Sequence, residues 1–349
     1  MSTSSSRARN LRPVAVLAAI AAIAASPAPP APRVTPAPTT RPAAAATPPP
    51  ARPLQSWKES PAKRALQRFL KEIEASGNSG EAPADVRVAV FATEGVLWDS
   101  GGVSLEDAWA LDRLRSLAPT KPEWASTPPF PALLGNDPAA LAALSPADLA
   151  RLSAAALAGL DQDEIRTQVL AWVRVAPPGR HAPADLARPA MRELLELLRT
   201  WNFRSYVVSD GPAEVTRALV EALYDLPAYR VIAPLSQIEV RDQGVRTRFV
   251  FSGEPAPPPS GASRLRTVVH HLGVRPLLVA GARESDGPLL EWASGRKAPF
   301  LALGFREAGA PSGSRTRPLP TAFSGARWTV VTPSEYWLSP PIRPAAPGK

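Results

Sequence analysis

Six short apolar runs, separated by longer segments of helical periodicity, constrain the fold of this chain more than any other feature of its sequence. Each run is four to nine residues long and rich in aliphatic or aromatic residues, as in strands buried inside a sheet. Strands that alternate with helices predict a parallel sheet whose strands are joined by crossover helices. The runs are residues 85–93, 203–209, 230–233, 276–281, 300–305 and 328–332.

The segment between the first two runs differs from the rest, because residues 104–200 have an almost entirely helical pattern. Ser145 is followed three residues later by Asp148, which is the spacing of a capping box at a helix start. The sequence therefore predicts a helical insertion after the first strand. Helices are expected at 57–74, 105–117, 146–160, 163–175, 188–201 and 287–294, with a further helix opening at Pro212 and a hairpin around 242–244.

Positive charge is concentrated outside the globular part of the chain. The formal net charge is +9, but residues 1–53 contain six arginines and no acidic residue, which leaves +3 for the remainder. Nucleic-acid binding needs a patch or stripe of Lys and Arg on one face of a domain. The remainder does not supply one, so no nucleic-acid partner is expected.

The N-terminus has the parts of an export signal. A basic start precedes the apolar run 14–25, and Ala22-Ile23-Ala24 offers a cleavage site. We therefore expect an exported protein, periplasmic or secreted; the alternative is an uncleaved segment that tethers it to the inner membrane. The chain has no cysteine, which excludes disulfides and thiolate metal sites. The predicted divisions are a signal peptide at 1–25, a disordered Pro/Ala-rich linker at 26–53, one domain at 54–335 and a disordered tail at 336–349.

Polar residues follow three of the predicted strands, where the active sites of parallel α/β sheets lie. The segments are 91–98 (FATEGVLW), 208–211 (VSDG) and 280–286 (AGARESD). With the helices between them, they resemble the motifs of haloacid dehalogenase-like (HAD) hydrolases, in a bacterial branch that is phosphoserine-phosphatase-like. The resemblance covers residues 85–335. It implies an α/β fold with a Rossmann-type parallel sheet and a helical cap, at about residues 100–190, inserted after the first strand.

The resemblance also gives roles to single positions, and several are filled by unsuitable residues. In this family an aspartate at the first strand end attacks phosphorus, and an acid two residues later protonates the leaving group. The nucleophile position falls on Ala92 and the acid/base position on Glu94. Ser209 holds the position of the phosphate-binding serine, and Arg264 that of the charge-balancing lysine. The metal-ligand and acidic positions of the closing motif fall on Ala282, Glu284 and Asp286.

Alanine at the nucleophile and at a metal ligand favours a catalytically inactive pseudophosphatase that binds an unidentified ligand or protein partner. No cofactor is expected, and Mg²⁺ only if hydrolysis persists. The alternative is a weak or altered Mg²⁺-dependent phosphomonoester hydrolase that recruits Glu94 or Asp99. A third interpretation is that the domain only fills space in a secreted assembly. In place of a retained binding pocket, Glu94, Ser209 and Asp286 are then turn and cap residues only. His270 and His271 are adjacent on a predicted helix and point in different directions, so they make a poor metal pair.

Overall fold

A computed structural model describes most of the chain beyond residue 53. The described residues are 54–79, 83, 86–100, 103–135, 137–176, 181–242, 247–256, 261–297, 299–306, 319 and 328–339. The predicted signal peptide and linker lie outside these residues. Within the described part, no helix is both long enough and apolar enough to cross a bilayer.

Parallel strands form the centre of the domain, as the sequence predicted. In the described residues the main sheet has six strands in the order β3-β2-β1-β6-β7-β8, so β1 lies in the interior. Its burial is complete along its length, which explains a run without polar alternation. The strands are β1 (Val88–Ala92), β2 (Arg204–Val208), β3 (Val231–Ile232), β6 (Leu278–Gly281), β7 (Leu301–Phe305) and β8 (Trp328–Val331).

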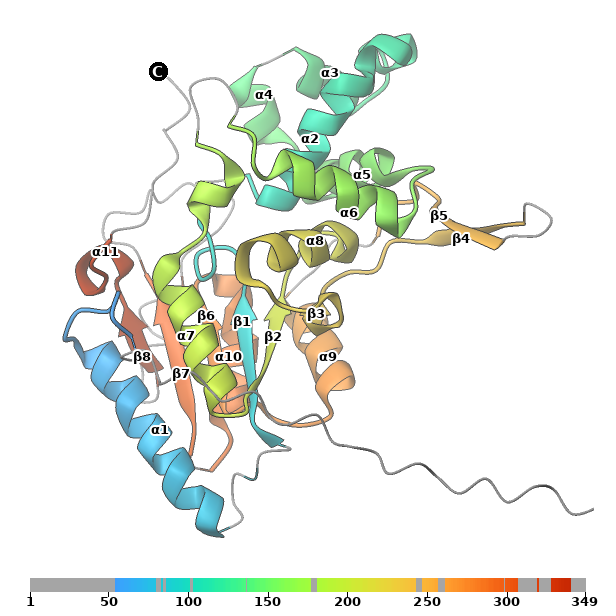
Figure 1. The fold of residues 1–349 in the computed structure, drawn as a ribbon. Helices are drawn as coiled ribbons and strands as arrows, with labels where there is room; N and C mark the ends of the chain where they lie inside the picture. The colour runs from blue at the N-terminus through green and yellow to red at the C-terminus, as the bar shows by residue number, and fades with distance from the viewer. Residues whose placement is uncertain are drawn as a thin grey trace, which may run out of the picture. The chain divides into compact units, whose positions relative to one another are not determined.

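Helices cover both faces of this sheet. In Figure 1, α1 (Pro61–Ser79) and α7 (Pro189–Thr200) cross in front of the strands, and α10 (Gly287–Ser294) lies behind β6 and β7. The buried side of α7 carries apolar residues at helical spacing, which is the reason this segment forms an amphipathic helix. The crossover helices α8 (Ala213–Tyr224) and α9 (Gly261–Leu272) join β2 to β3 and lead into β6.

The helical insertion leaves β1 at its carboxyl end and returns through α7. Figure 1 shows its helices gathered beyond that end of the sheet. Ser145 Oγ accepts a hydrogen bond from Asp148 N, and the Asp148 carboxylate accepts one from Ser145 N, so the predicted capping box is confirmed. The helices of the insertion are α2 (Leu105–Leu117), α3 (Phe130–Leu134), α4 (Pro138–Ala143), α5 (Pro146–Leu157) and α6 (Gln162–Trp172).

A two-stranded antiparallel hairpin projects beside the insertion, in yellow and orange in Figure 1. It consists of β4 (Ile238–Asp242) and β5 (Thr247–Phe251), with Val240 opposite Phe249. The predicted hairpin is therefore confirmed, although its turn lies outside the described residues.

The two ends of the domain differ from the sequence prediction. The first helix begins at Pro61, four residues later than expected, because Trp57 is buried against Trp337 instead of starting a helix. Leu338 N donates a hydrogen bond to Ser56 O at 2.9 Å. Chain packing therefore continues past residue 335, through α11 (Pro333–Tyr336) to at least Leu338, which corrects the predicted start of a disordered tail. Residues 340–349 of that tail lie outside the described part.

Candidate functional site

A cavity of about 880 Å³ opens where β1, β2 and β6 end. The predicted site residues Ala92, Ser209 and Asp286 come from these three strand ends, and α2 and α5 of the insertion supply the opposite wall. Parallel strands bring their carboxyl ends to one edge of a sheet, so residues far apart in sequence meet there. All six site residues predicted from the sequence line this cavity, namely Ala92, Glu94, Ser209, Arg264, Glu284 and Asp286.

The end of β1 is followed by a tight loop, residues 93–98. Thr93 O accepts hydrogen bonds from the N–H groups of Val96, Leu97 and Trp98. Gly95 has φ +77°, and a Cβ placed on it would lie 2.5 Å from the Cβ of Ala282. The loop therefore turns directly over the end of β6, and only a residue without a side chain fits at position 95.

A buried arginine holds this loop from the side away from the cavity. Arg188 is 2% exposed and donates hydrogen bonds to the carbonyls of Gly95 and Val96. Its guanidinium lies 5.3 Å from the ring centre of Trp337. The loop that carries Glu94 is thus fixed to the exit of the insertion and to the C-terminal segment.

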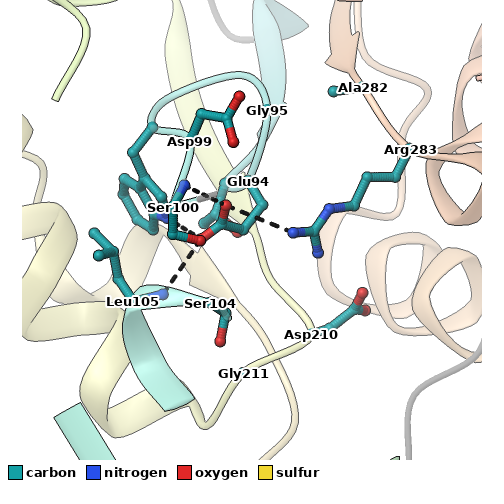
Figure 2. Close-up of polar contacts among 12 residues, drawn as sticks. Glu94, Gly95, Asp99, Ser100, Ser104, Leu105, Asp210, Gly211, Ala282 and Arg283 are labelled. Atoms are coloured by element: carbon teal, nitrogen blue, oxygen red, sulfur yellow. Dashed lines mark hydrogen bonds and ion pairs between the residues drawn. The ribbon is translucent and has the colours of Figure 1, made fainter. Parts of the chain in front are cut away.

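Glu94 is buried among its own loop, Ser100, the start of α2 and Arg283 (Figure 2). Its Oε1 accepts hydrogen bonds from Trp98 Nε1 at 2.8 Å, Ser100 Oγ at 2.9 Å and Leu105 N at 3.3 Å. Ser100 N reaches Oε2 at 3.2 Å, and Arg283 Nη2 lies 3.5 Å from the same oxygen. Figure 2 shows Arg283 extending from the end of β6 toward this carboxyl group.

Burial changes the pKa of Glu94. Loss of solvation raises the pKa of this carboxyl group to about 7, while the positive charge of Arg283 acts in the opposite direction. The neighbouring carboxylates Glu106 and Asp99 add to the increase. Glu94 therefore changes its charge near neutral pH.

Ser209, at the end of β2, is engaged by a second buried acid. Its hydroxyl donates to Glu106 Oε1 at 2.7 Å and accepts a hydrogen bond from Gly211 N at 3.1 Å. Thr216 Oγ1 donates to the same Glu106 oxygen at 3.0 Å, and Glu106 is 1% exposed. Burial raises the pKa of Glu106, and the hydrogen bond from Ser209 counteracts this.

Arg264 joins two carboxylates at the inner end of the cavity. Its Nε donates to Asp210 Oδ1 at 2.9 Å, and its Nη2 donates to Asp210 Oδ2. Its Nη1 donates to Asp286 Oδ1. The guanidinium is 6% exposed, and this burial lowers its pKa while the Asp286 charge raises it. The planar guanidinium is therefore engaged by two carboxylates of the protein itself, one of them through two parallel N–H donors.

The other oxygen of Asp286 is used by the backbone. Asp286 Oδ2 accepts hydrogen bonds from Ala282 N at 2.8 Å and Arg283 N at 2.9 Å, which closes the turn after β6. The Asp286 side chain is completely buried, whereas Glu284 is exposed. Asp286 therefore acts as a structural acid of this turn in addition to its pairing with Arg264.

The donor set does not fit the magnesium ion that the resemblance implies. Two of the expected ligand positions are the methyl groups of Ala92 and Ala282. The oxygens of Glu94 and Asp286 already accept several hydrogen bonds each. No group of three or more Asp, Glu or His side chains in the described residues is arranged to hold a metal ion. Mg²⁺ needs several oxygen ligands in octahedral geometry, and this end of the sheet does not offer them.

Two residues of the site carry no signal that singled them out in the sequence. Glu106 lies in the first turn of α2, where acids are common because they favour the helix dipole. Arg283 replaces a motif position that the resemblance leaves without a role. His270 and His271 are exposed on α9 and are not among the described residues that line the cavity.

Comparisons with known proteins agree with this architecture. The family model described as haloacid dehalogenase-like hydrolase matches residues 104–291, more than half of the chain. Curated proteins gave no match.

Similar solved structures include proteins from several bacteria. One is a protein of unknown function from Bordetella pertussis Tohama I, 17% identical with TM-score 0.41, over 63% of this chain and 89% of that chain. Another, from Anaerococcus prevotii DSM 20548, also of unknown function, is 12% identical with TM-score 0.43, over 75% and 88%. A phosphoserine phosphohydrolase-like protein from Francisella tularensis subsp. tularensis SCHU S4 is 15% identical with TM-score 0.34, over 63% and 87%. The family assignment rests on the family model.

Proposed function

Because this chain belongs to the haloacid dehalogenase-like hydrolase family, we propose that it keeps the fold of these hydrolases without their phosphatase chemistry and acts as a ligand-binding module. The cavity at the carboxyl ends of β1, β2 and β6 is the binding site in this proposal. Its volume of about 880 Å³ falls within the range of small-molecule sites, about 300–1,000 Å³.

The observation that carries the proposal is the methyl group of Ala92. It lies at the end of β1, in the position where the resemblance puts the nucleophile, and it lines the cavity. A methyl group has no lone pair with which to attack phosphorus, so no covalent phosphoenzyme forms at this residue. Removal of a catalytic nucleophile lowers kcat by about 10⁴–10⁶ in enzymes where it has been measured.

The nearby carboxylates do not replace the missing nucleophile. Three donors already occupy Oε1 of Glu94, and Ser100 N and Arg283 take up Oε2. Asp99 has a side chain that is 39% exposed, but it is absent from the described lining of the cavity. An attack on phosphorus by either group requires this loop to rearrange.

One observation favours the alternative of an altered hydrolase. Glu94 keeps a carboxyl group at the cavity, and a pKa of about 7 suits proton transfer at neutral pH. In this alternative Glu94 protonates a leaving group and another nucleophile attacks the substrate. The two functions differ in whether phosphomonoesters are turned over.

The deciding experiment is hydrolysis of 4-nitrophenyl phosphate by the purified protein, with Mg²⁺ and with a chelator. We expect turnover indistinguishable from buffer in both conditions. Chelator-sensitive turnover well above buffer contradicts the proposal. In that case Glu94→Gln, compared with the exposed Glu72→Gln on α1, shows whether Glu94 carries the activity.

The N-terminal segment suggests where in the cell this binding module is located. A leader and a Pro/Ala-rich tether precede the domain in the sequence. In our proposal they place the binding module outside the cytoplasm, in the periplasm or secreted, or attached to the inner membrane if the leader is retained. The ligand or protein partner is then met in that compartment.

A further inference from the structure

The charge of the cavity is opposite to that of a phosphate-binding site. Among the described residues that line it, seven carry carboxyl groups and two carry guanidinium groups. Phosphate sites concentrate cations and backbone N–H groups around the anion. Burial raises the pKa of two of these acids, Glu94 and Glu106. The other five still outnumber the two guanidinium groups, and like charges at short distance repel a phosphate ester.

Both arginines of the cavity are already paired with acids inside the protein. Arg264 is bonded to Asp210 and to Asp286, and Arg283 lies 3.5 Å from Glu94. Three of the five N–H donors of Arg264 are already used by its two carboxylate partners, which leaves at most two for a dianionic ligand. To offer more donors to a phosphate, Arg264 has to release Asp210 or Asp286, and release of Asp286 leaves a buried carboxylate without its cation.

Glu106 gives an independent indication that the ligand of this cavity carries a hydrogen-bond donor. It lines the cavity and is 1% exposed, and its Oε1 accepts hydrogen bonds from Ser209 and Thr216. Its Oε2 is buried and has no hydrogen-bond partner among the residues that the structure describes. A buried carboxyl oxygen without a donor is costly, and a ligand that brings an N–H group satisfies it.

The wall opposite the acids is apolar. Leu149, Ala154 and Leu157 of α5 line it, and Pro212 and Pro234 continue it on the other side. An apolar wall of this kind takes the hydrophobic part of a ligand. The carboxyl groups are too dispersed in the described residues to surround one metal ion, so a larger cation fits this arrangement better.

We propose that the ligand of this cavity is an organic cation, a primary ammonium group carried on an apolar body, which bonds to Glu106 and lies against α5. The inference rests on the proposed function, since it takes the cavity of this HAD-family domain to be a binding site. It adds the class of ligand, which is opposite in charge to a phosphate ester.

The test compares three probes of similar size by isothermal titration calorimetry on the full-length protein. They are 2-phenylethylammonium, the neutral 2-phenylethanol and phenyl phosphate. We expect the ammonium to bind at millimolar concentration or below, and the alcohol to bind at least about tenfold more weakly because it lacks the charge. Phenyl phosphate is expected not to bind.

Two variants locate the binding. Glu106→Gln keeps the shape of the side chain and is expected to weaken ammonium binding at least about tenfold. Ala150→Trp places a large side chain of α5 in the cavity and is expected to abolish ammonium binding. The test then does not depend on the folding of a single variant. Glu72→Gln, on the exposed side of α1, is the matched control and is expected to bind as the unaltered protein does.

The outcomes separate this inference from the proposed function. If phenyl phosphate binds without being hydrolysed, or if the ammonium does not bind at millimolar concentration, the cation inference is wrong and the non-catalytic module stands. If phenyl phosphate binds and is turned over, both fail. Ammonium binding that survives both Glu106→Gln and Ala150→Trp also overturns the inference, because the site is then elsewhere.

Discussion

Arg264 donates two hydrogen bonds to the carboxylate of Asp210, so the guanidinium at the inner end of the cavity has its anionic partner within the protein. The third contact of Arg264, to Asp286, connects the two strand ends that carry these acids. In the HAD resemblance this region receives the phosphoryl group. Here the Asp210 carboxylate pairs with Arg264, the arginine at the position that balances phosphoryl charge in the resemblance.

Loss of the Arg264 guanidinium is expected to destabilise the domain strongly. Arg264→Met leaves Asp286 buried with a charge that no cation compensates, and breaking buried ion pairs in this way costs about 3–5 kcal/mol. Urea unfolding followed by circular dichroism measures the change. Arg151→Met, whose ion pair with Asp148 is exposed, serves as control and is expected to change stability little. Equal effects of the two variants contradict the buried network.

Gly95 gives a prediction with an internal control. Gly95→Ala introduces a Cβ 2.5 Å from that of Ala282 at a positive φ, whereas Gly159→Ala introduces one at φ +76° in open space. The left-handed conformation alone costs about 1–2 kcal/mol for a residue with a Cβ. We expect Gly95→Ala to lose clearly more unfolding free energy than Gly159→Ala. Ala282→Gly in the Gly95→Ala background is expected to restore most of the difference, as a double-mutant cycle measures.

Glu94 is expected to make stability depend on pH. Its pKa is about 7 in the folded protein and 4.5 ordinarily, so the folded state resists its ionisation. The contribution of protonated Glu94 to the free energy of unfolding is fully present below about pH 4.5 and is lost as pH rises through about 7. One pKa unit corresponds to about 1.4 kcal/mol, so the loss is on the order of 3 kcal/mol.

Unfolding free energies across this pH range, for the unaltered protein and for Glu94→Gln, measure this effect. Burial also raises the pKa of Glu106, which gives a slope in the same direction in both proteins. The difference between the two curves therefore isolates Glu94. Parallel curves show that Glu94 titrates near its ordinary value.

Reconstruction of the missing nucleophile is expected to fail unless Arg264 is released as well. Ala92→Asp with Ala282→Asp supplies carboxylates at the ends of β1 and β6. In this double variant Asp210 still accepts two hydrogen bonds from Arg264. Adding Asp210→Gly frees two of its donors for a phosphoryl oxygen. One such donor contributes about 10²–10³ in kcat in enzymes where it has been tested. We expect Mg²⁺-dependent hydrolysis only in the triple variant, and activity of the double variant contradicts the blocking role of Asp210.

The leader gives a prediction about the mature chain. Cleavage at the Ala22-Ile23-Ala24 site removes the predicted signal peptide, residues 1–25 to within one residue, and leaves a mature N-terminus at Ala25 or Ser26. Cell fractionation with intact-mass measurement of the exported protein tests this. A full-length chain in the membrane fraction supports the uncleaved anchor instead, and a full-length chain in the cytoplasm contradicts export.

The fold was predictable because its signals are local. The buried run of β1 and the helical periods of α2 and α10 follow from residue spacing within single segments, and the structure gives α2 and α10 the predicted bounds. The start of α1 was not predictable in this way. Trp57 is taken out of the helical pattern by its contact with Trp337, which lies 280 positions later.

The sequence by itself determined the parallel sheet, the insertion after β1 and the absence of a carboxylate at position 92, because each depends on the identity or spacing of nearby residues. The tertiary structure decided what the surviving polar residues do. Arg264, Asp210 and Asp286 come from three elements. Only their meeting at one edge of the sheet pairs the arginine at the expected phosphate-binding position with two carboxylates of the protein. Burial likewise raised the pKa of Glu94, and it left one oxygen of Glu106 without a donor among the described residues, since solvation depends on what the whole fold places around a side chain.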